Sequence, residues 1–289
     1  MRFVKGVEKF EKYEEFLRKK ELVGPPPVIK VKGFPKEFLG VKIWGSGSLV
    51  NGVLDVSGSA YSEEPLELKR VDISGRLVCK SDLKAEEISV SGSLYVEGDL
   101  KATVLDISGK CEICGKALVS DLIDLSGSLS VGETLEAGRI DLAGRLKALN
   151  VKADNCTLAG SLRVMRDVDC NVFELKLNGF SEIGGMLKAS SVNVYIEEET
   201  VLRIGFFKLF TIRKRRRGLL VARKIVGNYV HLENTKCREV WGRLVEIGPN
   251  CVIGNVYYCD KVNVDPSSNV EGKLVQVKEE DVEVQLGGH

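Results

Sequence analysis

The chain has 289 residues, enough for a large core, and its 42 basic residues almost cancel its 41 acidic ones, leaving a formal net charge of +1. That balance excludes the strongly basic composition that is typical of nucleic-acid-binding proteins. The first twenty residues are charged throughout and no apolar run is long enough to span a membrane, so we expect a cytoplasmic protein without a signal peptide.

Near the N-terminus, residues 5–21 have the apolar spacing of an amphipathic helix. Apolar residues recur there at steps of three and four among charged ones, at Val7, Phe10, Tyr13 and Leu17. Three consecutive prolines, residues 25–27, end the pattern. We expect residues 1–27 to cap the first coil of the repeat described next, because an open sheet end invites unwanted strand pairing.

A unit of about 17 residues repeats through the following part of the chain. A small residue followed by glycine marks each unit, and these glycines are Gly58, Gly75, Gly92, Gly109, Gly127, Gly144 and Gly160. An apolar row keeps the same step, at Leu54, Val71, Ile88, Leu105, Ile123 and Ile140. Within a unit the apolar positions come in pairs two residues apart, which indicates strands. Three short strands in a unit of this length predict one coil of a parallel β-helix.

We therefore predict an all-β fold, a parallel β-helix (solenoid) of about twelve coils with a short N-terminal helix. The glycines are expected to supply the backbone angles of the corners. The predicted parts are a main block over residues 28–204, whose first one or two coils lie in 28–43, an aromatic and basic insertion over 205–218, C-terminal coils over 219–277, and a frayed polar tail over 278–289.

The predicted insertion concentrates large apolar and basic residues beyond what a β-helix corner holds. We expect a protruding hairpin or loop that docks on an anionic membrane surface or on a protein partner, since aromatic residues beside cations favour interfacial binding. The candidate docking residues are Phe206, Phe207, Phe210, Arg213, Arg215, Arg216 and Arg217.

The last predicted coils end in the inward apolar pair Val262 and Val264. The end of a β-helix exposes unpaired backbone donors and acceptors over an apolar core, whereas the outward positions of the coils are mostly charged or polar. We therefore expect copies of the chain to associate end to end through Val262 and Val264 and not side by side.

Catalytic, cofactor-binding and metal-binding residues are not predicted. Cys111 and Cys114 form a single Cys-x-x-Cys without the second pair that a zinc site needs, so we expect buried thiols. His231 is flanked by two apolar residues, and no nucleophile or carboxylate lies at a sequence spacing that would indicate a catalytic pair. A ladder of aspartates could bind cations, but a solvated face is the favoured interpretation. The ladder comprises Asp55, Asp72, Asp106, Asp124 and Asp141.

The glycine corners at 17-residue spacing, with units such as SGSLYVEGDLKA over residues 91–102, resemble the bactofilins, or polymer-forming cytoskeletal proteins. The stretches over residues 221–235 and 245–266 are similar to the distal block of the longer members. The resemblance covers about residues 40–275. It implies a right-handed β-helix that polymerises without nucleotide by end-to-end stacking and serves as a scaffold, often at the membrane. The length, the N-terminal helix and the insertion depart from the compact members.

Two functions are consistent with the sequence. The first is a non-enzymatic, self-assembling cytoskeletal scaffold that needs no cofactor, with copies of itself and an anionic membrane surface as partners. The second is a monomeric or small-oligomer solenoid that presents a face to a protein partner. A hexapeptide-type acyltransferase is less favoured, because Ile247-Gly248 and Ile253-Gly254 supply one hexapeptide step and the period elsewhere is about 17.

Overall fold

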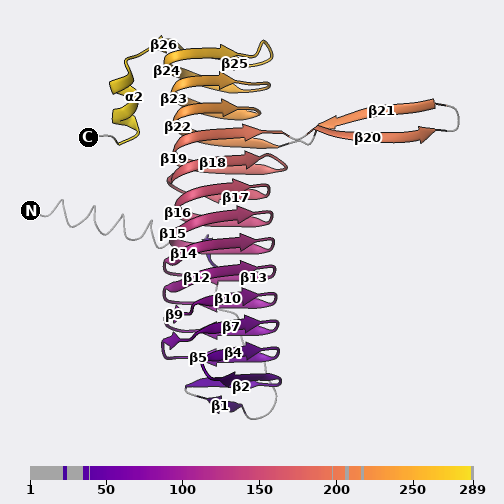
Figure 1. Ribbon diagram of the computed structural model, residues 1–289, viewed down its shortest axis with the longest axis vertical. Helices are drawn as coiled ribbons and strands as arrows, with labels where there is room; N and C mark the ends of the chain where they lie inside the picture. The colour runs from indigo at the N-terminus through magenta and orange to yellow at the C-terminus, as the bar shows by residue number, and fades with distance from the viewer. Residues whose placement is uncertain are drawn as a thin grey trace, which may run out of the picture. The chain divides into compact units, whose positions relative to one another are not determined.

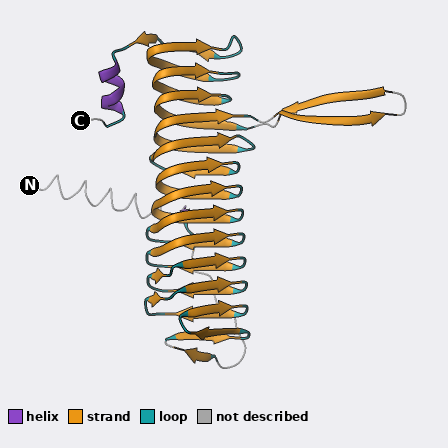
Figure 2. Cartoon of the chain, viewed as in Figure 1, coloured by secondary structure: helices purple, strands orange, loops and turns teal. Residues whose placement is uncertain are grey.

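The computed structural model describes residues 22–24, 35–38, 40–196, 198–205, 208–215 and 218–287. Strands make up most of these residues, and helix α2 (Glu279–Gln285) follows the last strand (Figure 2). The predicted all-β solenoid is confirmed, with about 12 turns of about 17 residues each. The chain divides into two compact units, Met1–Ala153 and Asp154–His289, which we describe in turn.

In the first unit, three parallel ladders run from coil to coil, one for each short strand of the repeat (Figure 1). The first ladder contains β4 (Val53–Val56), β7 (Arg70–Ile73) and β10 (Glu87–Val90). The second contains β5 (Ser59–Ser62), β8 (Arg76–Cys79), β11 (Ser93–Val96) and β13 (Lys110–Ile113). The third begins with β6 (Leu66–Glu67) and β9 (Leu83–Lys84). Longer strands then join neighbouring ladders, namely β12 (Leu100–Ile107), β14 (Ala117–Leu125) and β15 (Ser128–Leu142).

The apolar rows of the sequence form the core of these ladders. Val71 lies opposite Leu54 in one coil and opposite Ile88 in the next, and the same register continues through Leu105. Each of these side chains is fully buried. Because alternate residues of a strand point to opposite faces, the aspartates and serines between them point outward. The predicted period and the inward assignment are confirmed.

The repeated glycines serve a different purpose from the one predicted. None of the glycines at positions 75, 92, 109, 127 and 144 has a positive φ, so an ordinary residue could adopt their backbone angles. A Cβ built on Gly92, however, would lie 2.0 Å from the carbonyl oxygen of Gly75, and one on Gly109 would lie 2.1 Å from that of Gly92. These glycines are therefore required by the close approach of one coil's backbone to the next, and the prediction based on corner angles was wrong.

The start of the stack also differs from the prediction, which placed parallel coils in residues 28–43. Strands β1 (Lys36–Phe38), β2 (Val41–Trp44) and β3 (Gly47–Val50) all pair antiparallel, β1 with β2, β2 with β5 and β3 with β4. A two-residue turn, Asn51 at φ 52° and Gly52 at φ 78°, joins β3 to β4. Asn-Gly in this left-handed conformation is the preferred turn of a tight hairpin, which explains why the chain reverses here.

The predicted N-terminal helix over residues 5–21 lies outside the described residues. The short segment that follows it, Leu22–Gly24, contacts strand β13 in the middle of the unit. Leu22 and Val23 are buried, and the Gly24 amide donates a 3.4 Å hydrogen bond to Glu112 Oε1. Outward-facing Tyr95 and Glu112 are buried on the same face.

In the second unit the main strands pair in parallel throughout. They are β17 (Ser161–Val164), β18 (Val168–Lys176), β19 (Phe180–Tyr195), β22 (Leu219–Leu232), β23 (Thr235–Ile247), β24 (Val252–Val264), β25 (Asn269–Val270) and β26 (Leu274–Gln276). Strand β16 (Arg145–Leu158) crosses the boundary between the units. Between β19 and β22 the chain forms a separate two-stranded sheet of β20 (Glu198–Gly205) and β21 (Lys208–Arg215). This hairpin begins at Glu198, earlier than the predicted start at residue 205.

The C-terminal segment, predicted to be a frayed tail, instead forms helix α2 against the side of the coils (Figure 1). Val282 is fully buried, and α2 contacts β22, β23 and β24. Glu279 Oε1 lies 2.6 Å from Arg243 Nη1, and Gln285 accepts a hydrogen bond from Lys224. One buried valine and these polar contacts hold the segment, which is why the prediction from its charged composition was wrong.

We predict that Leu105→Ala lowers the free energy of unfolding by about 2–5 kcal/mol, because the truncation leaves a cavity between stacked coils. Asp106→Ala, at the exposed position one residue on, should change it by less than about 0.5 kcal/mol. Chemical denaturation of both variants tests this pair. A larger loss for Asp106→Ala would contradict the register, since a shift of one residue exchanges the two faces.

We further predict that Gly92→Ala destabilises the protein by about 1–3 kcal/mol or more, because the new methyl group meets main chain that cannot rotate away. Gly179→Ala is the matched control, since a Cβ at that position has no atom within 4 Å and its φ is not positive. This second variant should be neutral within about 0.5 kcal/mol. Thermal unfolding followed by circular dichroism compares them, and equal melting temperatures would refute the close-contact explanation.

Candidate functional site

The apolar core reaches the surface at the last coil of the second unit. One inward column runs through Val194, Leu232, Ile247 and Val264, which lie opposite one another on successive strands. The first three are at most 1% exposed, whereas Val264 is 37% exposed. Val262, in the neighbouring column, is half-buried, although Val245 behind it is 3% exposed. The two residues predicted for assembly therefore lie together on an uncovered core.

The exposure follows from the pairing of β24. Its outer edge pairs with β25 at Val252 and Ile253 and with β26 over residues 256–258. The remaining segment, Lys261–Val264, pairs with β23 on one side. No strand in the described part of the chain pairs with its other side. An edge of this kind presents unpaired backbone donors and acceptors next to apolar side chains.

The first strands of the first unit present a different kind of edge. Val41 and Ile43 of β2 are at most 1% exposed, and β1 pairs along the edge of β2. In addition, β3 covers β4 with an antiparallel strand. Short antiparallel edge strands of this type hinder the addition of a further parallel coil, as edge-protecting devices do in other sheets.

The hairpin β20–β21 carries part of the predicted docking cluster. Its backbone places Arg213 opposite Thr200, and Arg215 opposite Glu198. Phe210 lies opposite Arg203 in the same register. Phe206, Phe207, Arg216 and Arg217 lie outside the described residues. The cross-strand register thus sets acidic positions against basic ones at the base of the hairpin, which the composition of residues 205–218 alone did not indicate.

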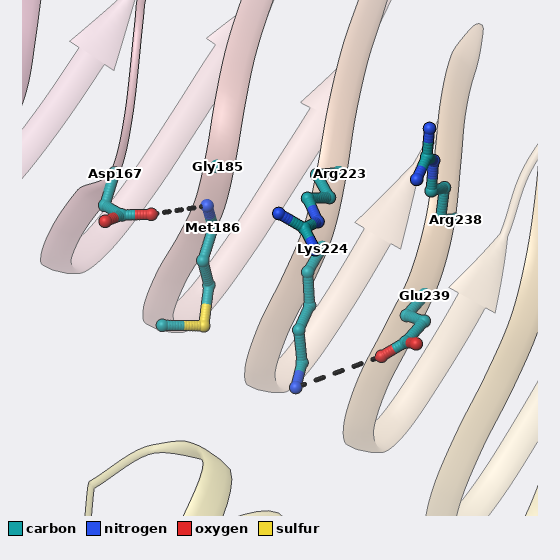
Figure 3. Close-up of a pocket in the computed structure, with 7 residues that line it drawn as sticks. All are labelled: Asp167, Gly185, Met186, Arg223, Lys224, Arg238 and Glu239. Carbon is teal, nitrogen blue, oxygen red and sulfur yellow. Dashed lines mark hydrogen bonds and ion pairs between the residues drawn. The ribbon is translucent and has the colours of Figure 1, made fainter. Parts of the chain in front are cut away.

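A groove with a volume of about 410 Å³ lies on the outer surface of the second unit (Figure 3). It is lined by Asp167, Gly185, Met186, Arg223, Lys224, Arg238 and Glu239. Strands β19, β22 and β23 bring these residues together, because Met186 pairs with Lys224 and Lys224 pairs with Glu239. The sequence analysis missed this groove. The available signal was the separation of the two arginines by about one coil length, which predicts that they stack.

An aromatic stack lies beside this groove. The rings of Trp241 and Tyr257 are 4.0 Å apart between centroids and inclined by 16°. Lys224 Nζ lies 5.1 Å from the centroid of the Trp241 ring and 3.9 Å from Glu239 Oε2. Trp241 Nε1 also donates to Glu239 Oε2 at 3.4 Å. Lys224 and Glu239 are therefore held by neighbours within the protein.

The cysteines have the character of buried apolar residues. All eight are free thiols, six of them are buried, and Cys114 and Cys259 are half-buried. Burial raises the pKa of the Cys79 thiol to about 12, which disfavours the nucleophilic thiolate at neutral pH. Cys114 donates to the Tyr95 hydroxyl at 3.2 Å. Within the described ranges no group of three or more His, Cys, Asp or Glu side chains is arranged to hold a metal ion.

The aspartate ladder and His231 also have internal partners. Asp72 accepts a hydrogen bond from Arg70 at 2.8 Å, and Asp141 is paired with Arg139. His231 lies between two carboxylates, with Nδ1 3.1 Å from Glu246 Oε2 and Nε2 3.7 Å from Glu233 Oε1. The ion pairs of Asp72 and Asp141 agree with a solvated, charge-compensated face for the ladder.

Comparison with known proteins gives two partial similarities, both to proteins of Bacillus subtilis (strain 168). The chain is 33% identical over 103 residues to the uncharacterized protein YhbF, covering 36% of this chain and 40% of that protein. It is 40% identical over 63 residues to the uncharacterized protein YhbE, covering 22% of this chain and 27% of that one. The chain thus spans less than half the length of either relative. No family model matches, and no solved structure matches.

Within the described ranges, no helix has the length and apolar composition that crossing a bilayer requires.

Proposed function

We propose that the protein is a non-enzymatic cytoplasmic scaffold that self-assembles through the open end of its second unit. The observation that carries this proposal is the exposure of Val264 at the end of a column whose earlier members are buried. A second copy that covers this end would extend the core and satisfy the free edge of β24. Covering each valine fully contributes at most about 1.5–3 kcal/mol, so the backbone pairing must supply much of the specificity.

The two kinds of edge favour one mode of assembly. Among the described residues, part of β24 in the last coil has an unpaired edge, whereas the first strands of the other unit pair antiparallel. There β2 buries Val41 and Ile43, although Phe38 of β1 and Val50 of β3 are exposed. We propose that two copies meet with the same surface, β24 against β24, in a contact with twofold symmetry. A contact of this type closes on itself and gives a dimer, so a longer polymer would use a second surface.

The proposal agrees with the resemblance to the bactofilins, from which we also take a right-handed coil and a role as a cytoskeletal scaffold. The likeness of the sequence repeats and the uncovered end of the last coil support this assignment. The two Bacillus subtilis proteins are uncharacterized and add nothing to this assignment.

We predict that Val264→Asp abolishes oligomers, because a carboxylate on the open end must be desolvated when a second copy covers it. Val172→Asp is a matched control, since Val172 is also 37% exposed but lies on the side of β18, opposite Ser191. Sedimentation velocity and far-ultraviolet circular dichroism measure assembly and folding of both variants. If oligomers survive Val264→Asp but are lost in Val172→Asp, copies associate through their sides and not through their ends. If the wild-type protein sediments as a monomer, self-assembly is refuted.

We also propose that the hairpin β20–β21 docks the scaffold on an anionic membrane surface. Its separate sheet supports this proposal, because within the described ranges the hairpin pairs with no strand of the solenoid, and β19 pairs directly with β22 without it. Basic residues near an anionic leaflet contribute about 1 kcal/mol each, so a single copy would bind weakly. An assembly of linked copies would bind more tightly, because the second contact forms at high effective concentration.

We predict that the protein sediments with vesicles containing anionic lipid and not with neutral vesicles, and that high salt weakens the binding. Changing Arg213, Arg215, Arg216 and Arg217 to Ser should abolish it. The control replaces four basic residues on the solenoid, Lys42, Lys69, Lys101 and Lys116, by Ser. The membrane proposal is contradicted if the arginine variant binds vesicles as well as wild type does, or if the arginine and lysine variants lose vesicle binding equally. The hairpin would then be expected to dock on a protein partner.

A further inference from the structure

Charged side chains on the outside of the coils are commonly paired with an opposite charge on the neighbouring coil. Arg70 lies 3.1 Å from Glu87, and Lys80 lies 2.6 Å from Glu97. The same arrangement joins Arg163 to Glu182 at 3.3 Å and Arg243 to Asp260 at 3.2 Å. Opposite charges at neighbouring positions of adjacent parallel strands avoid the repulsion that stacked like charges would create.

Arg223 and Arg238 depart from this arrangement. They occupy matching positions on β22 and β23, because the pairs Ala222–Cys237 and Lys224–Glu239 flank them in the register. Both arginines are exposed, and neither guanidinium group has an ion-pair or hydrogen-bond partner among the described residues. Figure 3 shows them on neighbouring strands, with dashed interactions drawn to Asp167 and Lys224 but none to either arginine. The two main-chain positions are thus one strand spacing apart, about 4.8 Å.

The carboxylates that line the same groove are already engaged. Asp167 Oδ1 accepts a 2.7 Å hydrogen bond from the Met186 amide. Glu239 accepts from Trp241 and lies near Lys224. Each of these acidic residues thus has a partner of its own, and no ion pair joins either of them to Arg223 or Arg238 among the described residues. The two guanidinium groups remain available to an anion from outside the protein.

The residues opposite the arginine pair on the adjacent coils carry no side chain. Gly254 lies opposite Arg238 on the next strand, between the pairs Cys237–Ile253 and Glu239–Asn255. Gly185, on the other side of the pair, belongs to the irregular step between Ile183 and Met186. The arginine pair thus has a glycine on each side. Arg166, whose carbonyl oxygen accepts a hydrogen bond from the Gly185 amide, is a third exposed arginine, and its guanidinium group has no partner in the described part of the chain.

We propose that this groove binds a phosphate-bearing anion between Arg223 and Arg238. Planar guanidinium groups bind phosphate oxygens in pairs, and two of them one strand apart can hold the same or adjacent phosphate groups. The volume of about 410 Å³ exceeds the needs of a single phosphate and fits a diphosphate or a phosphorylated small molecule. The ligand is recognised by charge. This site is independent of the open end at Val264 and goes beyond the proposed scaffold function.

Isothermal titration with inorganic pyrophosphate at low ionic strength tests the proposal. We expect wild type to bind, and Arg223→Ser with Arg238→Ser to lower the affinity at least tenfold. The control is Arg145→Ser with Arg163→Ser, which removes the same charge from exposed positions elsewhere and should leave the affinity within about twofold. A third variant, with both groove arginines changed to Lys, keeps the charge and should bind with intermediate affinity because the paired contacts are lost.

The source of the phosphate is distinguished with vesicles of neutral lipid containing phosphatidic acid, using protein whose four hairpin arginines are Ser. Sedimentation that depends on Arg223 and Arg238 and is competed by pyrophosphate identifies a lipid headgroup. Pyrophosphate binding without sedimentation identifies a soluble ligand. Absence of pyrophosphate binding by wild type, or equal weakening in the groove and control variants, overturns the proposal. Unchanged circular dichroism of the groove variant excludes misfolding as the cause.

Discussion

The contact between glycine backbones of successive coils is the constraint on which the repeat of the first unit depends. Where a Cβ on Gly92 would lie 2.0 Å from the Gly75 carbonyl oxygen, no other residue fits without moving main chain. This contact fixes the position of one corner per coil, and the apolar rows then stack in register on either side of it. A slip by one residue would expose the whole row, so the corner and the core specify the same register.

Much of the solenoid could be predicted from the sequence because its information is periodic. A spacing of about 17 residues repeated over several units outweighs local ambiguity, and the parallel pairing of Leu54, Val71 and Ile88 follows from it. The non-periodic parts required other signals. Asn51-Gly52 is a sequence signal for a hairpin, but a prediction based on the 17-residue repeat assigns this region to parallel coils and does not use that signal. Helix α2 depends on one buried valine, which composition does not reveal.

The groove shows a further limit of prediction from sequence. Met186 and Lys224 are neighbours in the structure although the hairpin separates them along the chain. Their proximity follows from the direct pairing of β19 with β22, which only the register on both sides of the hairpin defines. The exposed end was easier to anticipate, because Val262 and Val264 continue a visible apolar pattern. The residues of the hairpin were identified by composition, whereas its true start at Glu198 depended on cross-strand pairing.

The separation of core and surface explains how such a solenoid can vary its outer face without losing its fold. Inward side chains and corner glycines are fixed by contact with the adjacent coils, so changes there affect stability. Outward charges contribute little individually, since exposed ion pairs are typically worth less than about 1 kcal/mol. Arg223 and Arg238 can therefore remain unpaired at small cost to the fold, and a complete hairpin can be inserted between β19 and β22 while their strands stay paired. A binding surface on this scaffold needs only the right side chains at stacked positions, because the ladder already sets their spacing.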